Sequence, residues 1–146
     1  MKEYIVKVYE DRTCWYNKDG KRHREDGPAV EYANGKKEYW VNGLRHNENG
    51  PAVEYANGDK VYCINDEYHR EDGPAIELAD GYKEYWINGK FHREDGPAIE
   101  YVNGVKDYYI NGKRLTKEEF DNRNKVKELS VSEIEKLLGY KIKVVK

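Results

Sequence analysis

The chain has 146 residues, which suits a single domain with room for one modest core. Its formal net charge of −2 gives no general electrostatic attraction to nucleic acid or to anionic lipid. No run approaches the about 18 apolar residues that a membrane-spanning helix needs. Leu, Ile, Val and Phe number only 28, close to a disordered composition, but 14 Tyr and 3 Trp in a fixed pattern can build an ordered surface.

The N-terminal stretch, residues 4–9, alternates like a strand, with Tyr4, Val6 and Val8 on one side. It lacks the apolar core of a secretory signal, and the two cysteines suit a reducing compartment, so we expect a cytoplasmic location. Residues 1–22 are expected to form a divergent first repeat that caps the array, with Tyr16 in the column of Tyr39.

The chain then repeats with a period of 23 residues. The heptapeptide His-Arg-Glu-Asp-Gly-Pro-Ala stands at residues 23–29, 69–75 and 92–98, and His-Asn-Glu-Asn-Gly-Pro-Ala stands at 46–52. A fixed period of this size indicates a repeat architecture. We divide residues 23–115 into the units 23–45, 46–68, 69–91 and 92–114.

Each unit contains two turn signals, most often Asn-Gly, after short apolar runs. Asn-Gly between alternating runs is a strong hairpin signal, because both residues of a type I′ turn need φ > 0. The sequence therefore predicts a mainly β fold: an open single-layer antiparallel meander of 23-residue hairpin repeats with a small helical C-terminal cap.

Taking residues 34–35 as a two-residue loop sets the strand register. It places Val30 opposite Tyr39 and Ala29 opposite Trp40, and paired residues share a face. One face would carry Val30 with Tyr39. The other would carry Trp40 beside the glutamates.

The array is expected to end at Leu115, where the histidine does not recur. Thr116 with Glu119 and Ser130 with Glu133 form capping boxes, which predict helices over about 117–127 and 131–138, the second closed by Gly139. Residues 140–145 read as a last strand. We expect residues 116–146 to cover the end, or part of one face, of the sheet.

The repeated histidines and carboxylates suggest metal sites, but their spacing argues against them. Equivalent positions in successive hairpins are about 9–10 Å apart, whereas each zinc ligand reaches its ion at about 2 Å. The Glu-Asp pairs lack the alternating oxygen ligands of a calcium loop. We expect each His to pack near the tyrosine column and to hydrogen-bond a turn, each Asp to cap its own turn, and Asn49 to do the same. We predict no metal and no cofactor.

No catalytic arrangement stands out, because every histidine belongs to the repeat. Cys14 and Cys63 lie about two units apart, too far for a disulfide. We therefore expect a protein that is not an enzyme. The best binding candidate is an aromatic column flanked by glutamates, since Trp and Tyr are enriched at interface hot spots: Trp40, Trp86 and Tyr109, with Glu31, Glu54, Glu77 and Glu100. The alternative is that the C-terminal helices or a second copy cover this column as core.

The repeat resembles the MORN repeat family. The likeness lies in Asn-Gly-Lys-x-His at residues 88–92, the Gly-x-Ala-Val/Ile-x-Tyr strand at 27–32, and Lys-x-Tyr-Trp before the next Asn-Gly. It differs by having Glu-Asp-Gly-Pro-Ala where MORN units usually run Gly-x-Gly, a form similar to repeats of phages, large DNA viruses and bacterial proteins labelled as antitoxins. The resemblance implies a hairpin sheet used as a scaffold or binding surface.

We therefore expect a non-catalytic protein-binding module, carried by a phage or mobile element, that binds and inhibits a host defence or toxin protein in the host cytoplasm. Its partner would be another protein. The alternatives are a self-assembling structural protein, which would be a homo-oligomer, and a peripheral membrane adaptor. The lack of a basic patch disfavours the adaptor, and glutamates among the aromatics disfavour nucleic acid.

Overall fold

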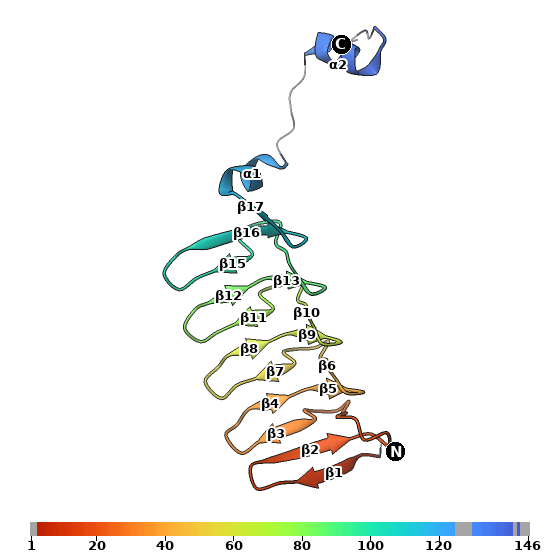
Figure 1. Ribbon diagram of the computed structural model, residues 1–146, viewed down its shortest axis with the longest axis vertical. Coiled ribbons are helices and arrows are strands. Elements are labelled where there is room, and N and C mark those ends of the chain that lie inside the picture. Colours follow the sequence, from red (N-terminus) through yellow and green to blue (C-terminus); the bar gives the residue numbers. More distant parts are fainter. Residues whose placement is uncertain (1–2, 125–129, 142, 144–146) are drawn as a thin grey trace.

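The computed structural model describes residues 3–124, 130–141 and 143, and it shows a long open antiparallel meander (Figure 1). Eleven strands form the main sheet in the order β1-β2-β3-β4-β7-β8-β11-β12-β15-β16-β17. The predicted mainly β, open meander fold is confirmed. The main-sheet strands are β1 (Ile5–Val8), β2 (Arg12–Tyr16), β3 (Val30–Tyr32), β4 (Lys37–Glu38), β7 (Val53–Glu54), β8 (Lys60–Val61), β11 (Ile76–Glu77), β12 (Lys83–Glu84), β15 (Ile99–Glu100), β16 (Lys106–Ile110) and β17 (Lys113–Leu115).

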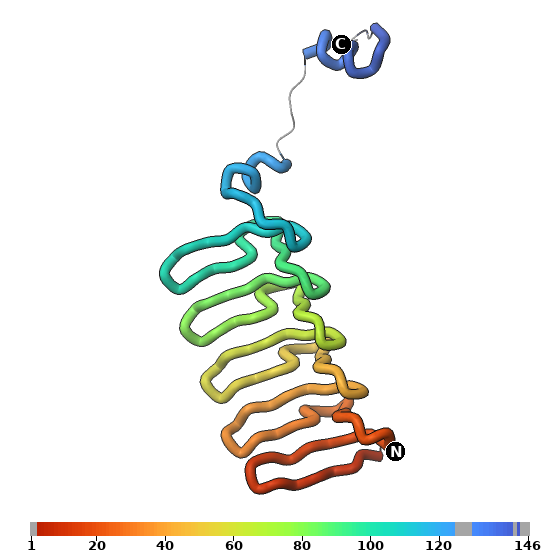
Figure 2. Tube along the Cα trace, in the orientation of Figure 1, coloured from red at the N-terminus to blue at the C-terminus, as the bar shows by residue number. Residues whose placement is uncertain are grey.

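Three small hairpins lie along one side of this sheet, and each continues from a main-sheet hairpin. Figure 2 traces this path, in which each unit makes one wide loop and one small loop before stepping to the next unit. The small hairpins are β5 (Trp40–Val41) with β6 (Leu44–Arg45), β9 (Cys63–Ile64) with β10 (Glu67–Tyr68), and β13 (Trp86–Ile87) with β14 (Lys90–Phe91).

The two turns of each unit have different geometries, although both carry the same sequence signal. In the small hairpin, Asn42 and Gly43 both have positive φ, 52° and 87°, as a two-residue type I′ loop requires. In the wide hairpin, Tyr32 N–H donates to Lys36 O, and of the loop residues only Gly35 has positive φ. The wide loop therefore has three residues, the pattern of a type I turn followed by a left-handed glycine.

The extra loop residue makes the predicted register wrong. Val30 pairs with Glu38, not with Tyr39. A slip of one residue moves every side chain of the returning strand to the other face. Glu38 and Trp40 therefore lie on the side of Val30, and Tyr39 lies on the side of Glu31.

The core is thin and follows the sheet from one unit to the next. It consists of Cys14, Ala29, Val30, Ala52, Val53, Cys63, Ala75, Ala98, Ile99 and Phe120, with one buried charged residue, Glu38. The alanine that follows each Gly-Pro is completely buried. The close stacking of successive units requires a side chain as small as alanine at this position.

The N-terminal repeat departs from the predicted alignment by one residue. His46 N–H donates to Tyr39 O in the second unit, whereas His23 N–H donates to Trp15 O. Trp15, not Tyr16, therefore holds the position of the tyrosine column. The loop that follows, residues 17–21, absorbs the difference, with Asn17 accepting from the backbone N–H of Lys21.

Both predicted capping boxes are present, and the helices that they start are short. Helix α1 (Lys117–Asn122) ends earlier than expected, and Phe120 packs on Tyr108 of β16 with ring centroids 4.8 Å apart. Helix α2 (Val131–Leu138) is closed by Gly139 as predicted, with φ 77°, but none of its side chains is buried. Helix α1 thus covers the end of the sheet, and α2 lies apart from it (Figure 1). Residues 142, 144 and 145 of the strand expected over 140–145, and residues 125–127 of the first expected helix, lie outside the described residues, and residues 140, 141 and 143 are not in a strand.

Candidate functional site

The predicted aromatic column lies on the side of the buried valines, away from the glutamates predicted to flank it. The indole N–H of Trp86 donates to Glu84 at 2.7 Å, and Glu84 pairs with Ile99 of the core. The indole N–H of Trp40 donates to Glu38 at 3.0 Å in the same way. Trp40, Trp86 and Tyr109 are all half-buried.

Side chains of the small hairpins pack against this column from both sides. Trp86 lies 5.2 Å from Tyr68 and 3.7 Å from Phe91 between ring centroids, and Phe91 lies 5.0 Å from Tyr109. The guanidinium groups of Arg22 and Arg45 lie 5.0 Å and 5.1 Å from the Trp40 ring. The aromatic column therefore packs between successive small hairpins, and neither α1 nor α2 covers it.

Glu38 is the buried charge within this packing, and its pKa follows from its partners. Burial opposes its ionisation, but hydrogen bonds from Lys36 and Trp40 outweigh burial and hold the pKa of Glu38 below its ordinary value. The Lys36 ammonium lies 2.7 Å from the carboxylate. In the second unit Val61 replaces this glutamate and Cys63 replaces the tryptophan, so the acceptor and its indole donor are exchanged together.

The four predicted glutamates form one row on the opposite side of the sheet. Each lies directly opposite a lysine on a neighbouring strand. The row therefore alternates in charge: Glu31, Lys37, Glu54, Lys60, Glu77, Lys83, Glu100 and Lys106. Opposite charges facing each other across strands contribute about 0.2–1 kcal/mol per pair. The structure thus separates these glutamates from the aromatic column, and lysines balance their charge.

The heptapeptides form the corners where each unit leaves a small hairpin and enters the next wide hairpin. Each histidine accepts a hydrogen bond, through Nδ1, from the backbone of a turn asparagine 19 residues later, as from Asn88 to His69 at 3.2 Å. The histidine prediction is confirmed in this respect. The neighbouring backbone also crosses between units, with His69 N–H donating to Tyr62 O, while Arg70 N–H donates to Trp86 O within its own unit.

The arginine of the heptapeptide binds within its own corner and onto an aromatic ring. Arg70 donates through Nε to Asp72 at 2.8 Å and through Nη1 to Pro74 O, and its guanidinium lies 4.0 Å from the Tyr62 ring. The hydrogen bond and charge of Arg70 lower the pKa of Asp72. Asp72 therefore pairs with the arginine, and a hydrogen bond from its own backbone N–H adds to this pairing, so the predicted turn cap is part of its role. Arg93 and Asp95 repeat this arrangement, with Arg93 3.9 Å from the Tyr85 ring. Two of these arginines also reach the glutamate row of the main sheet, with Arg93 donating to Glu100 at 2.6 Å and Arg24 to Glu31 at 3.1 Å.

The second heptapeptide departs from this pattern. Asn47 takes the place of the arginine and keeps only the bond to the proline carbonyl, 2.9 Å to Pro51 O. Asn49 donates its backbone N–H to Asn47 and does not cap its own turn as predicted. Among the described side chains, no cation stacks on the ring of Tyr39 as Arg70 stacks on Tyr62. Burial, and next the charges of Glu54 and Glu31, raise the pKa of Tyr39.

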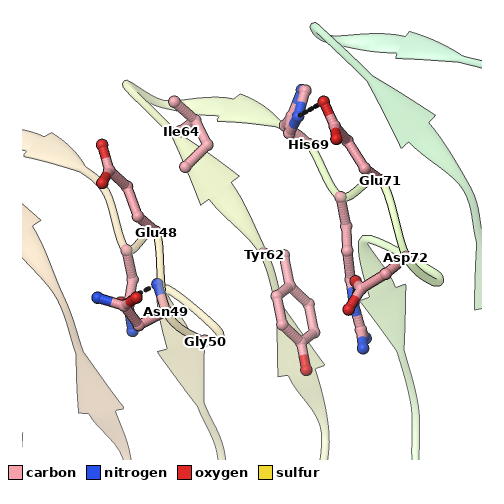
Figure 3. Close-up of a pocket in the computed structure, with 10 residues that line it drawn as sticks. Glu48, Asn49, Gly50, Tyr62, Ile64, His69, Glu71 and Asp72 are labelled. Carbon is pink, nitrogen blue, oxygen red and sulfur yellow. Dashed lines mark hydrogen bonds and ion pairs between the residues drawn. The ribbon is translucent and has the colours of Figure 1, made fainter.

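Three hollows of the same construction open between successive heptapeptides. Hollow I lies between residues 24–27 and 46–49, hollow II between 47–50 and 69–72, and hollow III between 70–74 and 92–95, with volumes of about 750, 450 and 700 Å³. Each contains one tyrosine of a second column, Tyr39 in hollow I, Tyr62 in hollow II and Tyr85 in hollow III. Figure 3 shows hollow II, with Tyr62 and Ile64 between Glu48 on one side and Glu71 with Asp72 on the other.

The hollows carry negative charge at their rims. Hollows I and II each have one arginine against three carboxylates, and hollow III has two arginines against four, so each has a net charge of −2 with histidine neutral. The carboxylates point outward: the side chains of Glu48, Glu71, Asp72, Glu94 and Asp95 are between 76% and 85% exposed. The arginine side chains beneath them are only 22–23% exposed.

Sequence reasoning assigned the heptapeptides a purely structural role and missed these hollows. The histidine and arginine do hold the corner, but the Glu and Asp between them face solvent. The available signal was the recurrence of a glutamate every 23 positions, followed by aspartate in three of the four heptapeptides, which places equivalent carboxylates at a constant spacing. In the part of the chain that the structure describes, no group of three or more His, Cys, Asp or Glu side chains is arranged to hold a metal ion.

No protein-family model matches the chain, and no curated protein matches it. The resemblance to MORN repeats therefore stays a prediction. Neither described helix has the length and apolar character needed to cross a membrane.

Proposed function

We propose that this chain is a non-catalytic protein-binding repeat module whose binding surface is the row of heptapeptide corners, hollows I to III. The observation that carries the proposal is the repetition of one hollow, built from a tyrosine between two acidic corners, along a single side of the array. Repeat arrays use such extended surfaces for binding because every unit presents equivalent side chains. The arrangement offers contacts and no nucleophile–base pair.

The experiment is affinity capture from a bacterial lysate with quantitative mass spectrometry. The test variant combines Glu48→Lys, Glu71→Lys and Glu94→Lys, which reverse charge at exposed rim positions of the three hollows. The control is Glu118→Lys on α1, also exposed. We expect a partner that the original chain and the control capture and the triple variant does not. Equal capture by the triple variant would contradict this choice of surface.

The more specific proposal is that binding inhibits a host defence or toxin protein in the cytoplasm. It is supported by the resemblance to repeats of phages and of proteins labelled as antitoxins. The two cysteines, which are buried and unpaired, suit a reducing compartment. Adding the purified chain to the captured partner tests it, and a partner whose activity is unchanged at saturation contradicts inhibition.

A second candidate function, self-assembly, is favoured by the N-terminal edge of the sheet. Strand β1 pairs on one side only, and Ile5, Val6 and Val8 are 49%, 48% and 77% exposed. An exposed apolar edge strand is a template for another strand. Light scattering at two concentrations tests whether a second copy adds to β1. A monomer at both concentrations contradicts assembly, and dimers that persist in Val6→Lys contradict the β1 contact.

A further inference from the structure

We infer that the occupant of hollows I to III is a cationic segment of the partner protein, in the polyproline II conformation, with Lys or Arg at every third residue. The inference rests on the proposed function and specifies the partner's chemistry. It follows from three features of the corner row: its spacing, its charge and the cations that already occupy part of it.

The spacing of the hollows follows from the sheet. Each unit adds two strands to the main sheet, so equivalent positions repeat at about 9.6 Å for a strand separation of about 4.8 Å. Backbone hydrogen bonds carry the same step through the corners, from Arg70 N–H to Trp86 O and from His92 N–H to Tyr85 O. The three hollows therefore form a row with a constant step.

A polyproline II segment matches this step. It has three residues per turn and rises about 3.1 Å per residue, so side chains at every third position point the same way about 9.3 Å apart. The mismatch is about 0.3 Å for each step from one hollow to the next, or about 0.6 Å over the two steps that separate hollow I from hollow III. A β-strand presents same-side residues every about 6.7 Å, and a helix presents them every seven residues, about 10.5 Å apart, so both fall out of step sooner.

The charge and shape of each hollow select a basic side chain. A tyrosine ring lies between two corners whose exposed carboxylates leave a net charge of −2. A Lys or Arg stem can lie in each hollow while its charged end reaches the rim carboxylates, and in hollow I it can also lie along the Tyr39 ring, as carboxylate hydrogen bonds and cation–π contacts favour.

The chain itself shows that this environment accepts a guanidinium. Arg70 and Arg93 lie 4.0 Å and 3.9 Å from their tyrosine rings and donate to Asp72 and Asp95. In hollow I, Asn47 stands in the place of that arginine, and the Tyr39 ring has no such stacked cation among the described side chains. Hollow I is therefore the position at which an incoming arginine replaces a missing internal one.

The test uses two labelled synthetic peptides of identical composition. One contains three Lys-Pro-Pro triplets, and the other contains three consecutive lysines followed by the prolines. Fluorescence anisotropy with the full chain is expected to show binding of the triplet peptide at least about tenfold tighter than the clustered peptide. Equal affinities would overturn the inference, because simple charge attraction does not depend on spacing.

Two variants locate the binding. The combined Glu48→Gln, Glu71→Gln and Glu94→Gln variant is expected to lose at least about tenfold in affinity, and the control Glu118→Gln to lose none. The variant Asn47→Arg with Asn49→Asp restores the common heptapeptide, so it supplies hollow I with an internal arginine without removing a packing group. We expect it to weaken binding of the triplet peptide severalfold while its melting temperature does not fall. Unchanged affinity in both variants would overturn the assignment to the hollows.

The outcomes separate this inference from the proposed function. If the rim charge reversal abolishes partner capture but neither peptide binds, the surface is correct and the cationic segment is wrong. If the triplet peptide binds and the rim variants leave capture unchanged, the corners accept a basic segment but do not form the partner's binding surface.

Discussion

Replacing Glu38 by glutamine tests the one buried carboxylate of the sheet. Its side chain is 4% exposed, and it accepts from the Trp40 indole at 3.0 Å and from the Lys36 ammonium at 2.7 Å. Glutamine keeps an oxygen acceptor for the indole but loses the negative charge that faces Lys36. The variant therefore removes the charged hydrogen bond and leaves the packing volume almost unchanged.

The expected cost is that of one hydrogen bond to a charged group, about 1.5–3 kcal/mol at neutral pH. For a chain of 146 residues, each kcal/mol lowers the melting temperature by about 2–4 °C. Glu54→Gln is the matched control, because Glu54 lies on the opposite side of the sheet in the alternating row and faces lysines. A partly exposed surface pair of that kind contributes about 0–1 kcal/mol.

The effect depends on pH with a definite sign. Because the folded-state pKa of Glu38 is lowered by its hydrogen bonds, ionised Glu38 contributes stability above the unfolded-state pKa, about 4.3. That contribution is lost as the pH falls through the folded-state pKa. Thermal unfolding followed by circular dichroism should show a large difference between the original chain and Glu38→Gln at pH 7, and this difference should shrink progressively as the pH falls below the unfolded-state pKa of about 4.3. Equal losses in Glu38→Gln and Glu54→Gln, or a difference that persists in acid, would refute this account.

Further experiments test the packing at the C-terminal end of the sheet, the corners and the Cys63 thiol. Phe120→Ala should lower the free energy of unfolding by about 3 kcal/mol and detach α1, which would appear as a lower melting temperature and a weaker near-ultraviolet circular dichroism signal. Ending the chain after Asn124 should leave the melting temperature unchanged, because α2 buries no side chain. His69→Phe should cost about 1 kcal/mol in chemical denaturation, because the Asn88 N–H loses its acceptor; no loss would contradict the corner role. Burial raises the pKa of Cys63 to about 11, so iodoacetamide at pH 8 should modify it only after unfolding, and rapid labelling of the native chain would contradict its burial.

The periodic features of the sequence predict the array well because they are local. The type I′ loop at Asn42 and Gly43 depends on two adjacent residues that tolerate positive φ. The capping boxes at Thr116 and Ser130 depend on side chains three residues apart. Such features need no knowledge of which strand lies opposite.

The faces could not be predicted because they depend on the length of one loop. Asn34-Gly35 fits a two-residue loop and also the last two positions of a three-residue loop, and the choice lies in the φ of Asn34. One residue of difference moves Trp40, together with Glu38, from the side of Glu31 to the side of Val30. The predicted binding residues therefore lie on two different faces, with the aromatic side chains on one and the glutamates on the other.

The strand register also explains why the sequence alone favoured the glutamates of the sheet, and not those of the heptapeptides, as candidate binding residues. Glu77 looks available for binding until the pairing shows Lys60 and Lys83 directly across from it on both neighbouring strands. Glu71 looks like turn chemistry until the corner shows an 85% exposed side chain above a tyrosine. Charges that a neighbouring strand balances are poor candidates for recognition, because a partner must compete with the lysines already there.

The heptapeptide separates these two roles within seven residues. Its histidine and arginine face the protein, where they bind a turn asparagine and a tyrosine ring, and its alanine is completely buried. Its glutamate and aspartate face outward at each corner, so the period that builds the sheet also fixes the distance between exposed charges. A sequence that must keep its corner for folding can change the rim carboxylates with little cost in stability. Where the corner arginine itself is replaced, at Asn47, the fold keeps its proline hydrogen bond and leaves a tyrosine without its stacked guanidinium, which makes that unit the most informative position for testing recognition.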